Sequence, residues 1–179
     1  MSRLQQTLDN LKAKIHDKFD AKRIDLIADW LDAWSYYIDQ ESTFDSKKRR
    51  NYAPGDIVSI CLGFNVGSEQ GGNRPAVVIG RSSRSSRTLL VVPLGSLSEQ
   101  DKEENLRPFE CFLGEIEEFN QLAQKPAKTR SKAIVNQIRT ISKQRIIRPT
   151  LQNHQCINIG KVKLKLIEDA LVATIKTTE

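Results

Sequence analysis

Residues 54–79 read PGDIVSICLGFNVGSEQGGNRPAVVI, and this stretch decides the fold. Two short runs of aliphatic and β-branched residues, Ile57–Leu62 and Ala76–Ile79, stand towards its two ends. The segment between them holds four glycines, which favour turns over regular structure. Apolar runs of this length, bounded by glycine and proline, are typical of β-strands. The stretch therefore predicts two strands joined by a glycine-rich loop.

The chain after residue 79 continues in the same way. Three more apolar runs predict strands at Thr88–Leu94, Phe109–Leu113 and Ala133–Ile138. Apolar residues then recur at helical spacing from Val162 to Ile175, which predicts an amphipathic closing helix. Short strands separated by turns and followed by one helix indicate a small, barrel-like antiparallel sheet.

The chain before Pro54 has a different pattern. All nine glycines and all six prolines lie at or after Pro54, so nothing before it interrupts a helix in the way these residues do. Apolar residues recur at spacings of four and three from Leu4 to Ile15, which predicts a first helix. Asp20 is placed to cap a second helix, whose apolar face runs to Ile38. The N-terminal region is therefore predicted to be a pair of helices.

We predict a helical arm over residues 1–50, a barrel domain over residues 51–179 and a hinge across 42–53. The hinge carries a basic run, Lys47–Arg50, which either attracts phosphate groups or is a solvated linker. The arm has an apolar face that must be buried against its own domain, a second copy of the chain or a partner.

Composition narrows the function. The net charge of +6 is a mild bias that suits an RNA-handling enzyme or a protein with an acidic partner. The three cysteines, Cys61, Cys111 and Cys156, are widely spaced without a paired motif, which favours reduced thiols and argues against zinc. The chain has no signal-peptide core and no apolar run of membrane-spanning length, so we expect a cytoplasmic protein without membrane contact.

A second long motif follows the first. Residues 134–145 read IVNQIRTISKQR, and together with the GSEQGG-x-RP segment at 67–75 they resemble the MazF/PemK toxins of bacterial toxin–antitoxin pairs. The resemblance covers about residues 52–175 and leaves the arm outside. It implies an α+β fold, in which an SH3-like antiparallel β-barrel with a C-terminal helix follows the two N-terminal helices.

The resemblance also implies an activity. Enzymes of this family cut single-stranded RNA without metal or cofactor: the 2′-hydroxyl attacks the adjacent phosphate and leaves a 2′,3′-cyclic phosphate. Two copies form a homodimer that binds RNA in a shared groove, and a cognate antitoxin, which alone contacts DNA, blocks that groove. This chain is thus expected to be a sequence-selective endoribonuclease of the bacterial cytoplasm.

Three residues are the catalytic candidates. Arg74 matches the family's active-site arginine, and its guanidinium offers a planar fork of donors for phosphate oxygens. The family usually places threonine or serine where this chain has Gly95, so Ser96 is the candidate hydroxyl. Because neighbouring strand residues face opposite sides, Ser96 would need a bulge or a strand end to take that place. Glu69 is expected to orient Arg74 or to take part in a proton transfer.

The candidate RNA-binding residues lie around the first loop and in the second motif. The glycines allow a tight turn and a close approach of backbone to phosphate, the aromatic and amide side chains can stack on or read a base, and the serine offers a hydroxyl. They are Ser68, Gln70, Gly71, Gly72, Phe64, Asn65 and Arg139. Phe64 has a second interpretation as a core residue. Gln137 and Thr140 are interpreted mainly as scaffold that ties a strand to the loop.

Two other functions stay open. CcdB-type toxins share the barrel and poison DNA gyrase without cutting nucleic acid; the GSEQGG-x-RP segment favours the nuclease, whereas Gly95 favours the gyrase poison. A catalytically weakened relative could instead bind RNA or protein through the arm. A further hypothesis is that the arm partly covers the RNA groove.

Overall fold

The computed structural model describes residues 1–98 and 100–176, which divide into two compact units, Met1–Ser42 and Thr43–Glu179. The first unit is a pair of helices, α1 (Arg3–Lys18) and α2 (Ala21–Gln40). The carboxylate of Asp20 accepts a hydrogen bond from the Arg23 amide at 2.8 Å, so the predicted cap is confirmed.

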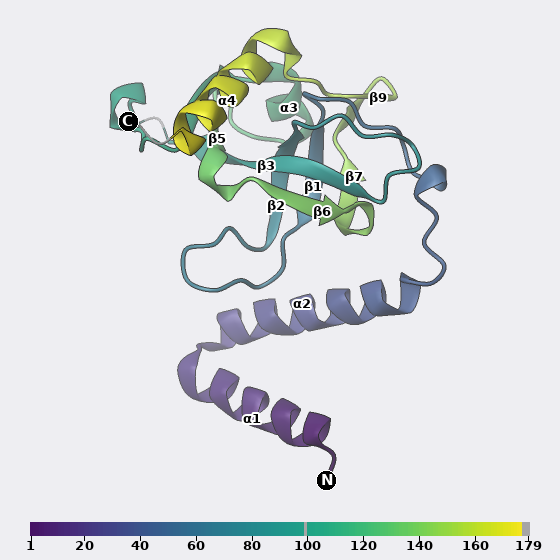
Figure 1. Ribbon diagram of the computed structural model, residues 1–179. Helices are drawn as coiled ribbons and strands as arrows, with labels where there is room; N and C mark the ends of the chain where they lie inside the picture. The colour runs from purple at the N-terminus through teal and green to yellow at the C-terminus, as the bar shows by residue number, and fades with distance from the viewer. Residues whose placement is uncertain (99, 177–179) are drawn as a thin grey trace. The chain divides into compact units, whose positions relative to one another are not determined.

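The second unit is built around an antiparallel sheet (Figure 1). Its strands are β1 (Ile57–Cys61), β2 (Asn73–Val78), β3 (Thr88–Leu97), β4 (Glu110–Glu115), β5 (Arg130–Ile134), β6 (Arg139–Ser142) and β7 (Ile146–Pro149). They run in the order β4-β5-β3-β2-β1-β7, and β6 also pairs with β3. In the described part of the chain, the end strands β4 and β7 are not paired with each other. The predicted α+β fold is confirmed, but hydrogen bonds do not close the sheet into a complete barrel.

Helices and short elements complete this unit. The helices are α3 (Glu117–Leu122) and α4 (Gly160–Ile175), the small strands are β8 (Leu151–Gln152) and β9 (Gln155–Cys156), and the 3-10 turns are η1 (Ser46–Lys48), η2 (Glu103–Asn105), η3 (Val135–Gln137) and η4 (Lys143–Arg145). The predicted strand Ala133–Ile138 is wrong beyond Ile134, because η3 interrupts it before β6 begins. The predicted closing helix is confirmed as α4.

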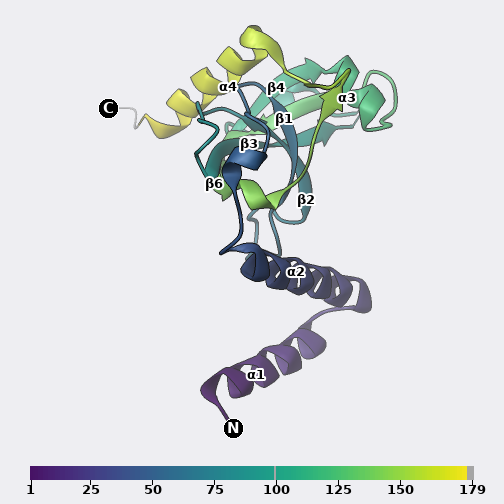
Figure 2. The same cartoon turned by 90° about the vertical axis from the view of Figure 1, so that its right-hand side faces the viewer.

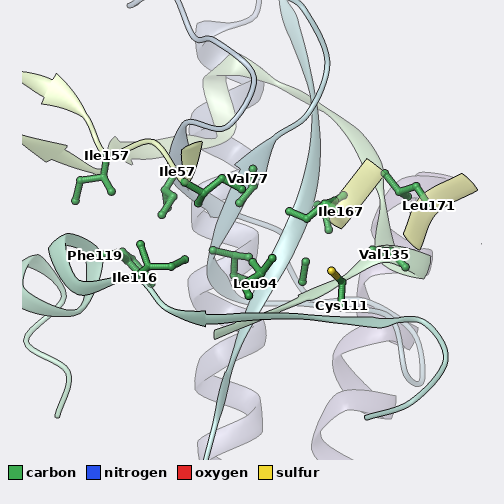
Figure 3. Packing of buried hydrophobic residues seen from close by; sticks show 14 residues of the cluster. Ile57, Val77, Leu94, Cys111, Ile116, Phe119, Val135, Ile157, Ile167 and Leu171 are labelled. Atoms are coloured by element: carbon green, nitrogen blue, oxygen red, sulfur yellow. The ribbon is translucent and has the colours of Figure 1, made fainter. Parts of the chain in front are cut away.

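The sheet has a hydrophobic cluster on each face. The α4 face holds Val77, Val92 and Leu94, against which Ile167 and Leu171 of α4 pack (Figure 3). Figure 2 shows α4 lying beside β4. The other face holds Ile60, Ala76, Val78, Leu89, Val91 and Ile141, among others. Alternate residues of β2 and β3 thus point to opposite faces, as the two-residue period of a strand requires. We call these the α4 face and the Ile60 face.

Pro75 ends the pairing between β2 and β3. The amide of Ile79 donates to the Leu90 carbonyl at 3.0 Å, and antiparallel donors on one strand recur every two residues. The next donors along β2 towards its start are therefore residues 77 and 75, and proline has no N–H. The last paired residues are Ala76 and Pro93, after which β3 pairs only with β5. The two strands part at this point.

Three further findings bear on the chain's chemistry. Cys61, Cys111 and Cys156 are all free thiols. Within the described residues, no group of three or more His, Cys, Asp or Glu side chains lies together in a way that suits a metal ion. None of the helices among those residues is both long and apolar enough to cross a bilayer.

Candidate active site

The loop between β1 and β2 is held in a defined shape. The Gly72 amide donates to the Gly63 carbonyl at 2.8 Å, and the Leu62 amide donates to the Gly72 carbonyl at 2.8 Å. The Asn65 side-chain amide donates to two carbonyls inside the loop, those of Leu62 at 3.2 Å and Gln70 at 2.7 Å. In this structure Asn65 therefore shapes the loop. Whether it also contacts RNA remains a prediction.

Glycine is required at position 71. A Cβ there would lie 2.8 Å from the Gly63 carbonyl oxygen, closer than side chains approach a backbone oxygen. Gly72 has φ +71°, a conformation that residues with a side chain rarely adopt. The double glycine of the motif thus has a local physical reason.

Gln137 joins this loop to the sheet. Its Oε1 atom accepts a hydrogen bond from the Gln70 amide at 3.1 Å and another from Nη2 of Arg139 at 3.1 Å. Both motifs found in the sequence meet at this one oxygen, and the scaffold role predicted for Gln137 is confirmed. Arg139 is half-buried and pairs with Val91 of β3, so it lies on the Ile60 face.

Replacing Gln137 by alanine is expected to loosen the loop without unfolding the domain. The lost hydrogen bond to the Gln70 amide is worth about 1 kcal/mol, so amide exchange across residues 63–72 should accelerate by roughly fivefold. Hydrogen-exchange mass spectrometry would measure this. Gln121→Ala, on exposed α3, is the matched control. Equal exchange in both variants would show that Gln137 does not hold the loop.

Arg74 lies at the start of β2 with its side chain exposed. It pairs with Ile60 of β1, which places it on the Ile60 face at the rim of the sheet. Its Nε atom donates to the Gly71 carbonyl at 3.1 Å. Among the described residues its Nη atoms have no hydrogen-bond partner. The guanidinium is therefore oriented by one contact, while the edge that suits a phosphate faces solvent.

Gly95 lies in a regular part of β3. It pairs with Lys132 of β5, and its neighbours Leu94 and Ser96 keep the same register, so the bulge considered at this position is absent. By alternation from Val91, position 95 belongs to the Ile60 face. Continuing the β2–β3 register beyond the last pair would bring Gly95 level with Arg74, although the strands have parted there. The position of the missing hydroxyl thus faces the same side as Arg74.

An ion pair occupies the neighbourhood of Gly95. Nζ of Lys132 lies 2.8 Å from Oε1 of Glu110, and the side chains are only 20% and 11% exposed. A Cβ at Gly95 would lie 3.5 Å from Cε of Lys132, an ordinary contact distance. Burial raises the pKa of Glu110, but hydrogen bonds from Lys132 and the Arg107 amide outweigh it, so the pKa lies below its ordinary value. Glu110 therefore stays ionised and paired with the lysine.

Ser96 faces away from Arg74. By alternation from Leu94 it belongs to the α4 face, where its hydroxyl accepts a hydrogen bond from Nζ of Lys125 at 2.9 Å. Lys125 lines a cavity of about 320 Å³ together with Ser59 and Pro75. Burial lowers the pKa of Lys125. In this structure the two residues expected to act together, Arg74 and Ser96, lie on opposite faces of the sheet.

The other predicted loop residues differ in their exposure. Ser68 and Glu69 are exposed, whereas Phe64 and Gln70 are half-buried. In the described chain Glu69 forms no ion pair with Arg74; its backbone amide donates to the Val66 carbonyl at 3.2 Å. The structure thus links Gly71 to Arg74, and links Gln70 to Arg139 through Gln137.

Comparison with known proteins identifies the family. A family model described as "PemK-like, MazF-like toxin of type II toxin-antitoxin system" matches residues 53–173. A comparison with curated proteins gave no match. Among solved structures, the crystal structure of MazF (Form-I) from Deinococcus radiodurans aligns with a TM-score of 0.48 and 18% identity over 71% of this chain and 98% of that chain. Because the family model spans well over half of the sequence, this chain belongs to the PemK-like, MazF-like toxins of type II toxin–antitoxin systems.

Proposed function

We propose that this toxin is an endoribonuclease that cuts single-stranded RNA, with Arg74 at its active site. The orientation of the Arg74 side chain supports this role. Its Nε atom donates to the Gly71 carbonyl, and both Nη groups face solvent at the rim of the sheet. A guanidinium presented in this way can donate hydrogen bonds to two phosphate oxygens at once. A cation at this position stabilises the negative charge that develops on those oxygens.

The reaction is an internal displacement at phosphorus. The 2′-hydroxyl loses its proton and bonds to the phosphorus, the bond to the 5′-oxygen breaks, and that oxygen takes up a proton. Negative charge accumulates on the non-bridging oxygens in between, and Arg74 faces them. We assign proton acceptance to Glu69, whose exposed loop position lets it approach the substrate.

The loop around Arg74 supplies the RNA contacts. The backbone at Gly71 and Gly72 approaches phosphate closely, Ser68 and Gln70 add polar contacts, and Phe64 stacks on a base. Arg139 adds a second cation on the same face of the sheet. We further propose that two copies form a homodimer with a shared groove, that a cognate antitoxin covers it, and that the toxin acts in the bacterial cytoplasm.

The decisive test is cleavage of a mixed RNA pool in EDTA, followed by mapping of the product ends. The expected products carry 2′,3′-cyclic phosphate and 5′-hydroxyl ends. Intact RNA combined with inhibition of DNA gyrase would favour the non-cutting toxin instead.

Ser96→Ala is expected to leave cleavage within about twofold of the unmodified protein. The side chain faces the opposite side of the strand from Arg74, and its hydroxyl is engaged by Lys125. Initial rates on one defined RNA would measure this. A loss of a hundredfold or more would show that Ser96 reaches the reacting phosphate after all.

A further inference from the structure

The positive charge of this chain is concentrated in two short segments. Residues 43–50 read TFDSKKRR and residues 80–88 read GRSSRSSRT. Together they hold seven basic residues and one acidic residue, Asp45, a net charge of +6, and the whole chain also has a net charge of +6. The remainder of the protein is therefore neutral overall. The mild net positive charge of the whole chain is therefore a strong positive charge of these two segments.

The two segments are fastened to each other. The hydroxyl of Ser46, a buried residue, donates to the Ser85 carbonyl at 2.9 Å. Nε of Arg84 donates to the Lys47 carbonyl at 3.0 Å. Residues 43–50 therefore pack on the sheet domain along the loop between β2 and β3. In Figure 1, η1 is the short blue turn beside that loop.

Three further contacts hold these segments in place. Nζ of Lys143, a fully buried residue, donates to the Ser83 carbonyl at 2.9 Å and so holds the loop of residues 80–88. The guanidinium carbons of Arg49 and Arg87 lie 5.8 and 5.3 Å from the centre of the Phe44 ring. One arginine from each segment thus shares a single aromatic ring.

All seven basic residues are exposed: Lys47, Lys48, Arg49, Arg50, Arg81, Arg84 and Arg87. We call this set the basic surface. It holds five guanidiniums, which suit phosphate oxygens, and the serines of the loop add hydroxyl donors. Neither segment contributes an exposed large apolar side chain. A protein interface usually has an apolar or aromatic centre, whereas a phosphate backbone needs only charge and donors.

The basic surface lies away from Arg74. Arg74 stands at the start of β2, whereas Arg81 follows the end of the same strand. With about 3.3 Å per residue along a strand, the two are separated by on the order of 20 Å. A short oligonucleotide bound at Arg74 does not reach that far, but a longer RNA does.

We propose that the basic surface is a second RNA-binding site, which holds the sugar–phosphate backbone of long substrates without reading their sequence. This inference rests on the proposed function, because it takes RNA as the substrate. It assigns to the predicted hinge a binding role that extends the toxin's contact with RNA beyond the cleavage site.

The test variant replaces Lys47, Lys48 and Arg81 by glutamine. Within residues 1–98 and 100–176, the side chains at these three positions make no hydrogen bond or ring contact, so their replacement should not disturb the fold. Binding of a fluorescent RNA of about 30 nucleotides is measured in an Arg74→Ala background, so that no cleavage occurs. Affinity should fall by about tenfold, and the slope of log Kd against log salt should decrease by about 2, since each phosphate contact contributes about 0.7.

The control replaces Lys102, Lys161 and Lys176, which are exposed and scattered, and removes the same charge. It should leave both quantities unchanged. With Arg74 restored, the test variant should lower kcat/KM on the long RNA but not on an RNA of about six nucleotides. If the two variants bind the RNA equally well, the basic surface is not an RNA-binding site, even if the unmodified protein cleaves RNA. Poly-glutamate that competes as well as an RNA of equal charge overturns it in favour of an acidic protein partner.

Discussion

Arg74→Ala is expected to reduce RNA cleavage by about 10²–10³-fold, the cost of removing one donor that stabilises developing charge. The side chain is exposed, and its hydrogen bond to the Gly71 carbonyl is the one it makes within the described part of the chain, so the fold should be unaffected. Single-turnover rates on a defined RNA measure the chemical step, and circular dichroism with thermal melting checks the fold.

Two companion variants sharpen this experiment. Arg74→Lys keeps the charge but loses the planar fork, so its rate should fall between those of arginine and alanine. Arg148→Ala removes an exposed arginine that lines the cavity beside Ser59 and should cut normally. An Arg74→Ala protein that cuts at the unmodified rate would refute the proposed site.

Gly95→Thr is expected to raise the cleavage rate by about tenfold or more. Position 95 belongs to the same face as Arg74, and a side chain there meets Lys132 only at ordinary contact distance. The new hydroxyl can hydrogen-bond the reacting phosphate or relay a proton, for which effects of 10²-fold and above are typical. The rate is measured on the RNA used for Arg74.

The control for this gain is Gly95→Val, which has nearly the same shape without the hydroxyl. Either residue should stabilise β3 by up to about 1 kcal/mol relative to glycine, because β-branched residues suit strands. Melting temperatures should therefore rise together, while only threonine raises the rate. Equal rates would mean that no hydroxyl is missing at this position.

The strands and helices that follow a clear pattern were predictable from the sequence. The helices of the arm and α4 carry strong periodicity, and the first three strands are clear apolar runs; the structure contains them all. The predicted strand at 133–138 failed because apolar residues such as Val135 are buried in a turn, η3, as firmly as in a strand. Composition cannot separate these two cases. The short elements β8, β9 and α3 hold too few residues to show any period.

The sequence allowed the residues of the site to be predicted, but not the face of the sheet on which each side chain lies. The motif led to Arg74 and Gly95, and the glycine pattern led to the loop. Which side Ser96 takes depends on whether β3 contains a bulge, and that is set by its pairing with β5. The pairing of Lys132 with Glu110 was also missed, because the two residues come from different strands. Neither strand alternates charged with apolar residues along its length, so the sequence carried no clear signal of this pair.

The predicted boundary between arm and domain lies at residues 50 and 51, whereas the structure divides the chain after Ser42. A run of four basic residues has the composition of a solvated linker. Its packing depends on the buried hydroxyl of Ser46 and on the ring of Phe44, two contacts that its charge conceals.

The proline that follows Arg74 has a lasting effect on the molecule. Its nitrogen stands where β2 would next donate to β3, and the two strands separate there. The proline ring lacks an N–H under every condition of temperature, ionic strength or pH. The strands beside Arg74 therefore cannot gain the next hydrogen bond of the ladder.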